Sequence, residues 1–130
     1  MITLPTWMRN ALFATAAMNI FAAIGFFPSV HTVRAVVGMP EGEHPFYLAT
    51  VSLFVLLFGL GYLWTAIASR ADRFFITLAT AGKLSFFMLV VWFWITSSLP
   101  LRAVLAGSGD LIFGLLFLKW LYSTQPVVAA

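Results

Sequence analysis

The chain has no cysteine and very little charge. None of its 130 residues is a cysteine, which excludes disulfides, thiolate metal sites and thiol catalysis. Only 8% of the residues are charged and 62% are hydrophobic, whereas a soluble domain of this size needs far more charge to cover its surface. The mean hydropathy is +1.02. This composition indicates an integral membrane protein.

Runs of basic residues are also absent. The net charge of +3 comes from single lysines and arginines scattered along the chain, so we predict no nucleic-acid partner. The sequence shows no nucleophile–base pair, no phosphate-binding loop and no pair of haem ligands at matching depths, and we predict no cofactor. The lipid bilayer is the partner that this composition predicts.

Four apolar runs are long enough to cross a bilayer as helices. A hydrocarbon core needs about 20 apolar residues, and the runs cover about residues 11–30, 46–68, 74–96 and 103–122. Apolar and polar residues do not alternate within these runs, as they would in the strands of a membrane barrel, and the chain is too short to close such a barrel. The first run is too long for the apolar part of a secretory signal, so we expect a true span. The sequence therefore predicts one all-α domain over residues 1–130, an up-down four-helix bundle within the membrane.

The connectors predict how these spans are arranged. The links 69–73 and 97–102 are short, which makes neighbouring spans antiparallel packing partners. The connector 31–45 is longer, and its first half predicts a short helix from Ser29 that ends near Gly38. We expect this helix to lie on the membrane surface with Arg34 among the headgroups.

The basic residues near the span ends predict the orientation. With four spans, both termini share a side with the link 69–73. That side carries more basic residues than the opposite side, namely Arg9, Arg70, Arg73 and Lys119 against Arg34 and Arg102. Because cytoplasmic flanks carry the excess of lysine and arginine, we predict that both termini are cytoplasmic.

Three strongly polar side chains fall within the predicted spans, at Asn19, Lys83 and Asp110. At about 1.5 Å per helical residue they lie about 12, 13 and 18 Å from the cytoplasmic face of a core about 30 Å thick. A lone charge at this depth costs about 2.5–3.5 kcal/mol. Because opposite charges on consecutive spans relieve each other, we predict that Lys83 faces Asp110, with Asn19 as a hydrogen-bonding neighbour.

Helical spacing adds two residues to this cluster. Thr80 and Phe87 share the helical face of Lys83, and small residues beside Asp110 allow a neighbouring helix to come close. The predicted ligand-binding residues are Asn19, Thr80, Lys83, Phe87 and Asp110. Two readings stay open at this point: a buried ion pair can simply fix the register of the bundle, or it can serve a ligand, an ion or an oligomer contact.

The sequence contains two further polar features, one in the connector 31–45 and one at Tyr62. The connector holds residue types that bind zinc or iron, at His31, Glu41, Glu43 and His44. Their spacing matches no strong metal signature and also suits a solvated turn, so we predict no metal site. Tyr62 lies near the cytoplasmic end of the second span, where its hydroxyl either reaches the interface or closes a cavity; we expect the first.

Several short motifs carry a family resemblance. The first span contains Asn19, the connector contains "RAVVGMP", the second span contains "PFYL" and "FGLGY", the third "GKLSFF" and the fourth "GDLIFGLLFLKWL". This layout resembles the DoxX-like group of small four-span bacterial membrane proteins. Some members of the group resemble subunits of quinone-linked oxidoreductases, and others resemble assembly or chaperone factors. The resemblance implies a four-helix fold with a polar interior in the bacterial inner membrane.

These observations lead to one functional hypothesis and two alternatives. We expect a midplane pocket that binds a lipophilic molecule of the quinone or isoprenoid type, or an accessory subunit of a membrane complex. Lys83 would bind a carbonyl, Asp110 would balance Lys83, and Asn19 would orient the ligand. One alternative is a proton-coupled transporter acting as a dimer, like the small multidrug resistance proteins, although these carry a glutamate in the first span. The other is a membrane enzyme that uses Lys83 and Asp110 as acid and base.

Overall fold

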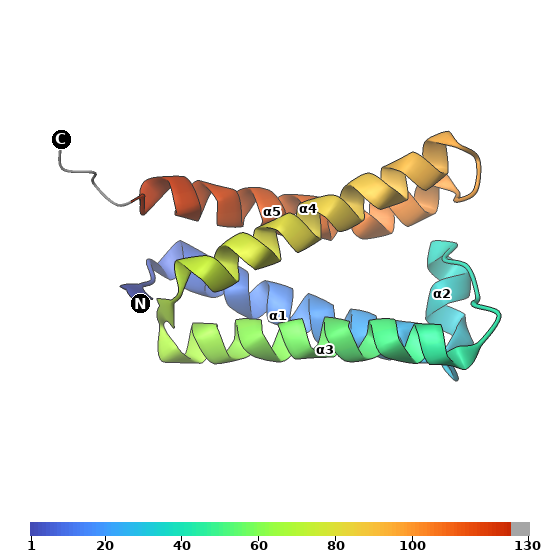
Figure 1. The fold of residues 1–130 in the computed structure, drawn as a ribbon, viewed down its shortest axis with the longest axis horizontal. Coiled ribbons are helices and arrows are strands. Elements are labelled where there is room, and N and C mark those ends of the chain that lie inside the picture. Colours follow the sequence, from blue (N-terminus) through green and yellow to red (C-terminus); the bar gives the residue numbers. More distant parts are fainter. Residues whose placement is uncertain (126–130) are drawn as a thin grey trace.

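The structure, a computed structural model, describes residues 1–125 and is helical over most of that length. Four long helices, one short helix and two very short strands make up the fold (Figure 1). In chain order they are β1 (Ile2–Thr3), α1 (Thr6–Phe26), α2 (His31–Val37), α3 (Pro45–Ala68), β2 (Arg70–Ala71), α4 (Arg73–Ile95) and α5 (Leu101–Ser123). The N-terminus and the last turn of α5 lie at the same end of the molecule (Figure 1).

The helices agree with an integral membrane protein. By length and composition α3, α4 and α5 can each cross a membrane, and α1 qualifies together with α2, from which it is separated by a bend of 108°. The predicted first span, about 11–30, extends beyond the helix at its end, because α1 begins at Thr6 and ends at Phe26. Phe27 is extended since it precedes Pro28, and a residue before proline is disfavoured in the helical conformation.

The short helix predicted in the connector is confirmed as α2. It begins at His31, and not at Ser29 as predicted, and ends at Val37. Gly38 follows with φ 74°, in the left-handed region that glycine adopts without strain. A Cβ at Gly38 would clash with Cγ of Pro100. The end of α2 therefore packs directly against the connector between α4 and α5.

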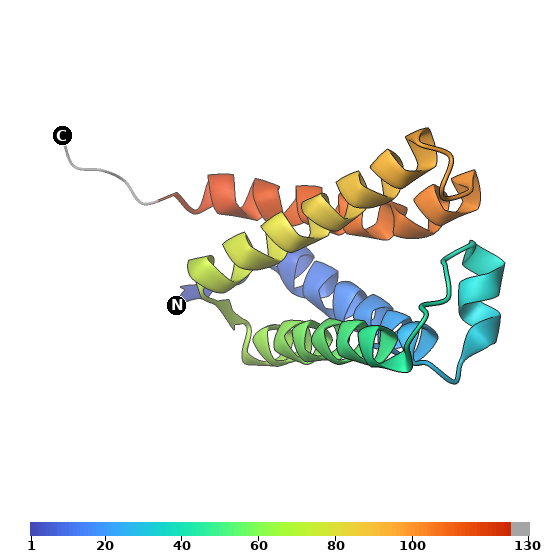
Figure 2. The same cartoon turned by 45° about the vertical axis from the view of Figure 1, so that its right-hand side comes forward.

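The long helices form two antiparallel pairs, α1 with α3 and α4 with α5. The pairs join mainly through α1 and α5, and α4 leaves α3 along its length (Figure 2). The prediction that every two neighbouring spans pack together is thus wrong for α3 and α4, although their connector is short. Glycines explain the pairing, because Gly59 lets α3 approach Asn19 and Gly114 lets α5 approach Leu84. Between α3 and α4, the Phe75 ring stands against the backbone of α3.

The end that holds the N-terminus is the tightly packed one. Strands β1 and β2 pair antiparallel, with Ile2 opposite Ala71, and tie the start of the chain to the α3–α4 connector. Next to them lies the hydrophobic core, whose fully buried large side chains are Met8, Leu12, Tyr62, Ile76, Phe117 and Trp120. A strand of two residues has no sequence pattern, so this ribbon was not predicted.

Candidate functional site

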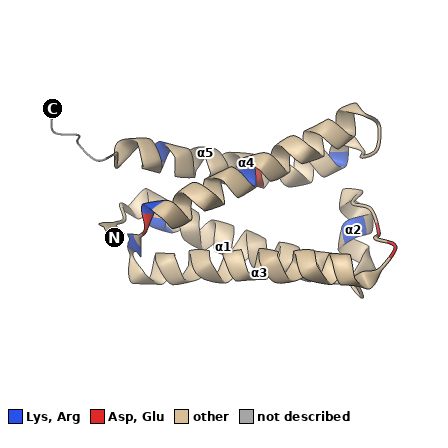
Figure 3. Ribbon diagram, in the orientation of Figure 1, with Lys and Arg blue, Asp and Glu red and all other residues tan. Residues whose placement is uncertain are grey.

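Lys83, Asp110 and Asn19 meet between the two helix pairs. Nζ of Lys83 donates to Oδ1 of Asp110 at 3.0 Å and to Oδ1 of Asn19 at 3.3 Å. The Lys83 side chain is 4% exposed and that of Asp110 19%. The charged pair lies midway along α4 and α5 (Figure 3). The predicted proximity of the three side chains is confirmed, whereas their role in binding a ligand stays a prediction.

The polar cluster formed by these three residues has free hydrogen-bonding capacity. An ammonium group has three N–H donors, and the contacts above use two of them. Oδ2 of Asp110 has no hydrogen-bond partner among the residues that the structure describes. Asn19 is held in place because its Nδ2 donates to the carbonyl of Val55 at 3.1 Å. The cluster can therefore offer one donor and one acceptor to another molecule.

A cavity of about 360 Å³ extends from this cluster. All five helices contribute to its wall, which is apolar except at Asn19, Arg34, Lys83, Asp110 and the Tyr62 ring edge. The volume falls within the roughly 300–1,000 Å³ of small-molecule sites, which combine an apolar wall with a few polar groups. The arrangement suits a ligand with a small polar head and an apolar body.

Two of the five predicted site residues do not line this cavity. Thr80 is buried, and its hydroxyl donates to the carbonyl of Ile76 at 2.7 Å within α4. Phe87 belongs to a shallow apolar hollow elsewhere on α4, and Phe86 lines the cavity instead. Phe87, four residues beyond Lys83, lies beside Gly107 of α5, whereas Phe86, three residues beyond Lys83, lies on the side of α4 that lines the cavity.

Tyr62 is a wall residue that the sequence prediction placed wrongly. Its side chain is 2% exposed and its ring packs against those of Phe58, Phe75 and Phe117, with centroids 5.7–6.2 Å apart. Nζ of Lys83 lies 5.1 Å from the ring centroid, a cation–π distance. Tyr62 therefore closes the cavity toward the tight core and does not reach the interface.

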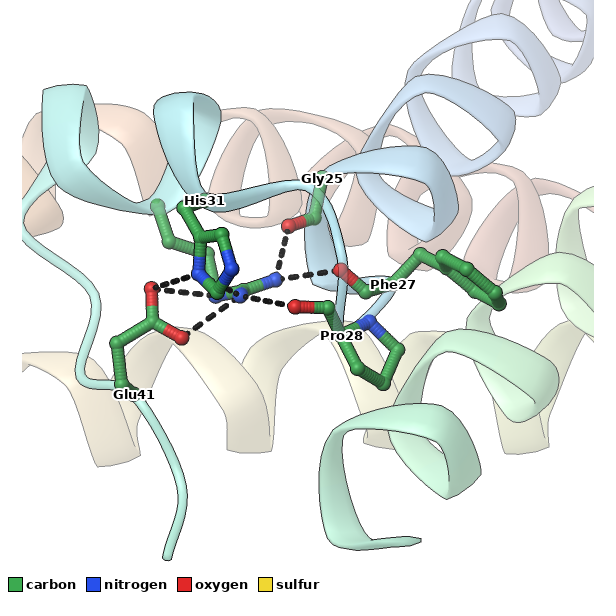
Figure 4. Close-up of polar contacts among 6 residues, drawn as sticks. Gly25, Phe27, Pro28, His31 and Glu41 are labelled. Carbon is green, nitrogen blue, oxygen red and sulfur yellow. Dashed lines mark hydrogen bonds and ion pairs between the residues drawn. The ribbon is translucent and has the colours of Figure 1, made fainter. Parts of the chain in front are cut away.

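Arg34 forms a second polar cluster at the opposite end of the cavity. Its Nη1 donates to the carbonyls of Gly25 and Phe27, at 3.0 and 2.7 Å. Its Nη2 donates to the carbonyl of Pro28 at 3.0 Å, as Figure 4 shows. Gly25 lies in the last turn of α1, and Phe27 and Pro28 directly follow it, so these carbonyls have no α-helical donor; that of Phe27 also accepts from the N–H of Val30. Arg34 is 1% exposed, so the predicted headgroup position is wrong.

Glu41 completes the shell around Arg34. Its carboxylate accepts from Nε at 3.1 Å and from Nη2 at 2.7 Å, a bidentate pair (Figure 4). Nδ1 of His31 lies 3.3 Å from Nη2 of Arg34 and 3.5 Å from the Glu41 carboxylate. The hydrogen bond from Arg34 lowers the pKa of Glu41 below its ordinary value. Every donor of Arg34 thus has a partner inside the protein.

The four connector residues of metal-binding type, His31, Glu41, Glu43 and His44, do not form a metal site in this part of the structure. Among residues 1–125 no group of three or more histidines, cysteines or acidic residues is placed to hold a metal ion. His31 and Glu41 contact Arg34. Nδ1 of His44 accepts from the backbone N–H of Phe46 and caps the start of α3. Glu43 is exposed.

Arginines also contact the ends of two other long helices. Nε of Arg9 donates to the carbonyl of Ala66 near the end of α3, at 3.0 Å. Nη1 of Arg73 donates to the carbonyl of Leu121 near the end of α5, at 2.8 Å. A cation at a helix C-terminus satisfies free carbonyls and opposes the helix dipole. Part of the basic bias at the N-terminal end therefore has a local structural cause.

No protein-family model, curated protein or solved structure matches the chain. The site is therefore interpreted from its own geometry. Of the two buried cations on the cavity wall, Arg34 is fully bound by fixed protein groups, while Lys83 and its partner Asp110 keep free donor and acceptor positions. The polar cluster around Lys83 is accordingly the candidate site.

Proposed function

We propose that this protein crosses the bacterial inner membrane several times, with both termini in the cytoplasm, and binds a lipophilic molecule of the quinone or isoprenoid type. One observation carries the proposal: an apolar cavity of about 360 Å³ ends at a buried ion pair whose hydrogen-bonding positions are not all used. Buried polar atoms normally have at least one hydrogen-bond partner, and Oδ2 of Asp110 has none among the residues that the structure describes. A ligand head that binds there would complete their partners.

Each residue has a distinct part in the proposed complex. The third N–H of Lys83 donates to a carbonyl or hydroxyl oxygen of the ligand. The free oxygen of Asp110 accepts from a ligand hydroxyl when one is present. Asn19 holds Lys83 in position through its own contact with the backbone of α3. The apolar body of the ligand lies along the cavity wall, where Phe54 and Phe86 provide contact area.

Membership of the DoxX-like group is part of the proposal and rests on the sequence motifs. An accessory role in a larger membrane complex fits the same site, because a bound lipophilic molecule can be passed to a neighbouring subunit. The dimeric transporter and the membrane enzyme remain alternative predictions. Both would also need Lys83 and Asp110, so variants of this pair test all of them.

The direct test is to identify what the protein carries. The wild type is purified in mild detergent, its lipids are extracted, and mass spectrometry compares them with those of the source membrane. We expect one neutral lipophilic species to be enriched in the wild type and absent from Lys83→Met. Lys119→Met is the matched control, because Lys119 lies over the Trp7 ring and not on the cavity wall. An identical lipid composition in wild type, Lys83→Met and bulk membrane contradicts the proposal.

A further inference from the structure

A glycine precedes each charge of the polar cluster, and the two glycines have opposite surroundings. A Cβ at Gly109, before Asp110, would lie 2.5 Å from Sδ of Met18 in α1. A Cβ at Gly82, before Lys83, would meet nothing within 4 Å. At the depth of the ion pair, the edge between α1 and α5 is thus filled by a side chain. The edge between α3 and α4 is open.

The open edge leads from the polar cluster to the lipid-facing surface. Gly82 is exposed and also lines the cavity. On α3, Val51 and Phe54 line the cavity while 41% and 57% exposed. On α4, Phe86 lines it and is half-buried. The rim of the opening is therefore apolar and formed by two helices that pack on each other through Phe75 near one end and diverge beyond it.

Both ends of the cavity are closed to water. Tyr62 and the packed core close the end toward the N-terminus. At the other end α2 lies across the cavity, with Val33 and Val37 on its wall. Arg34 fixes α2 to the end of α1 through three carbonyls. A ligand that passes between α3 and α4 therefore requires neither Tyr62 nor α2 to move.

We propose that the ligand of the cavity enters sideways from the lipid phase, head first, between α3 and α4 past Gly82. This inference rests on the proposed function and narrows it to lipids with a small uncharged polar head and one flexible apolar tail. A charged head would add net charge beside an ion pair that is already balanced, in surroundings where an unpaired charge is costly. The tail stays between Val51, Phe54 and Phe86, where the wall is apolar.

The test uses a farnesyl alcohol analogue that carries a photoreactive diazirine near the end of its tail. The wild type in liposomes is irradiated with the probe, with and without excess unlabelled farnesyl alcohol, and the modified peptides are mapped by mass spectrometry. We expect modification that the competitor removes, on residues 51–54 of α3 and near Phe86 of α4. Lys83→Met should lower it about tenfold, because the head loses its donor.

A variant pair tests the entrance itself. A Cβ at Gly82 meets nothing within 4 Å, so Gly82→Trp can place a ring in the opening, and it should lower the competitor-sensitive modification about tenfold. Ala81→Trp is the matched control, because Ala81 is exposed and does not line the cavity. We expect Ala81→Trp to behave like the wild type.

The outcomes separate the two proposals. Competitor-sensitive modification that maps instead to Phe21 and Ala106, the exposed wall residues between α1 and α5, overturns the α3–α4 entrance but keeps a lipid-binding cavity. Equal modification of Gly82→Trp and wild type likewise overturns the α3–α4 entrance but keeps a lipid-binding cavity. Modification that the competitor never reduces overturns the isoprenoid class and the entrance together.

Discussion

The two buried cations of this protein, Arg34 and Lys83, lie on the wall of one cavity and differ in what surrounds them. Arg34 has a complete set of partners, made of three carbonyls and the carboxylate of Glu41. Lys83 has Asn19, one oxygen of Asp110 and the face of an aromatic ring. The first arrangement holds the α1–α2 bend closed, and the second leaves positions open toward a cavity.

This difference shows that burial of a charge does not by itself identify a site. A buried charge whose donors all end on fixed protein groups is explained by the structure that it stabilises. A buried charge with an incomplete shell beside an apolar cavity is the one that another molecule can complete. If this distinction holds, Arg34 only stabilises the fold, whereas Lys83 also binds a ligand.

The largest effect is expected at Arg34. Arg34→Met leaves the carbonyls of Gly25 and Pro28 without donors, while that of Phe27 keeps only the N–H of Val30, and should lower the free energy of unfolding by about 3–5 kcal/mol. Arg34→Lys keeps the charge but cannot reproduce the planar fork, so it should fall between Arg34→Met and wild type. Unfolding in detergent followed by circular dichroism measures both. A stable Arg34→Met would show that the carbonyl contacts do not hold the bend.

The polar cluster should respond as a coupled pair. Lys83→Met leaves Asp110 without its cation and should cost about 2.5–3.5 kcal/mol, and Asp110→Asn a comparable amount. The double variant should recover most of the loss, because no unpaired charge remains. The same unfolding measurement provides this double-mutant cycle. Additive losses in the double variant would mean that the two side chains do not interact in the membrane.

The close approach of α4 and α5 beside Lys83 predicts a smaller effect. A Cβ at Gly114 would lie 2.6 Å from Cδ2 of Leu84, so Gly114→Leu should cost about 1–3 kcal/mol through overpacking. Gly82→Leu is the matched control on the same pair of helices, since its side chain would extend into open space. Its unfolding midpoint should stay near that of wild type, and equal losses in both variants would contradict the packing argument.

The smallest effect is expected from Glu41 and depends on pH. Because the fold lowers the pKa of Glu41, its contribution to stability is present above the ordinary carboxyl pKa and is lost as the pH falls through the lowered value. Wild type should thus unfold at higher temperature than Glu41→Gln at pH 7, and the gap should close in acid. Glu43→Gln, on an exposed connector position, should show no such gap. A gap that does not change with pH would exclude the ion pair as its cause.

Some of this architecture could be read from the sequence. The apolar runs identified the long helices, Gly38 marked the end of α2, and the matching depths of Asn19, Lys83 and Asp110 predicted their contact. Arg34 was misplaced because its partners are backbone carbonyls, which residue types do not reveal. Phe86 was missed because the spacing along α4 does not show which of its faces packs against α5 and which lines the cavity. Phe87 lies beside Gly107 of α5, and this contact between helices is not visible in the sequence of either helix alone.

The measurement that tests the central claim most directly is the lipid content of the Lys83→Met/Asp110→Asn double variant. Its unfolding free energy should return close to that of the wild type, so any loss of lipid cannot be attributed to misfolding. We expect the enriched lipophilic species to fall about tenfold or more in extracts of this variant, because the donor of Lys83 is gone and the carboxylate of Asp110 is replaced by a neutral amide. If the double variant is stable and keeps the full amount of that species, Lys83 and Asp110 are a structural pair and the site proposal is wrong.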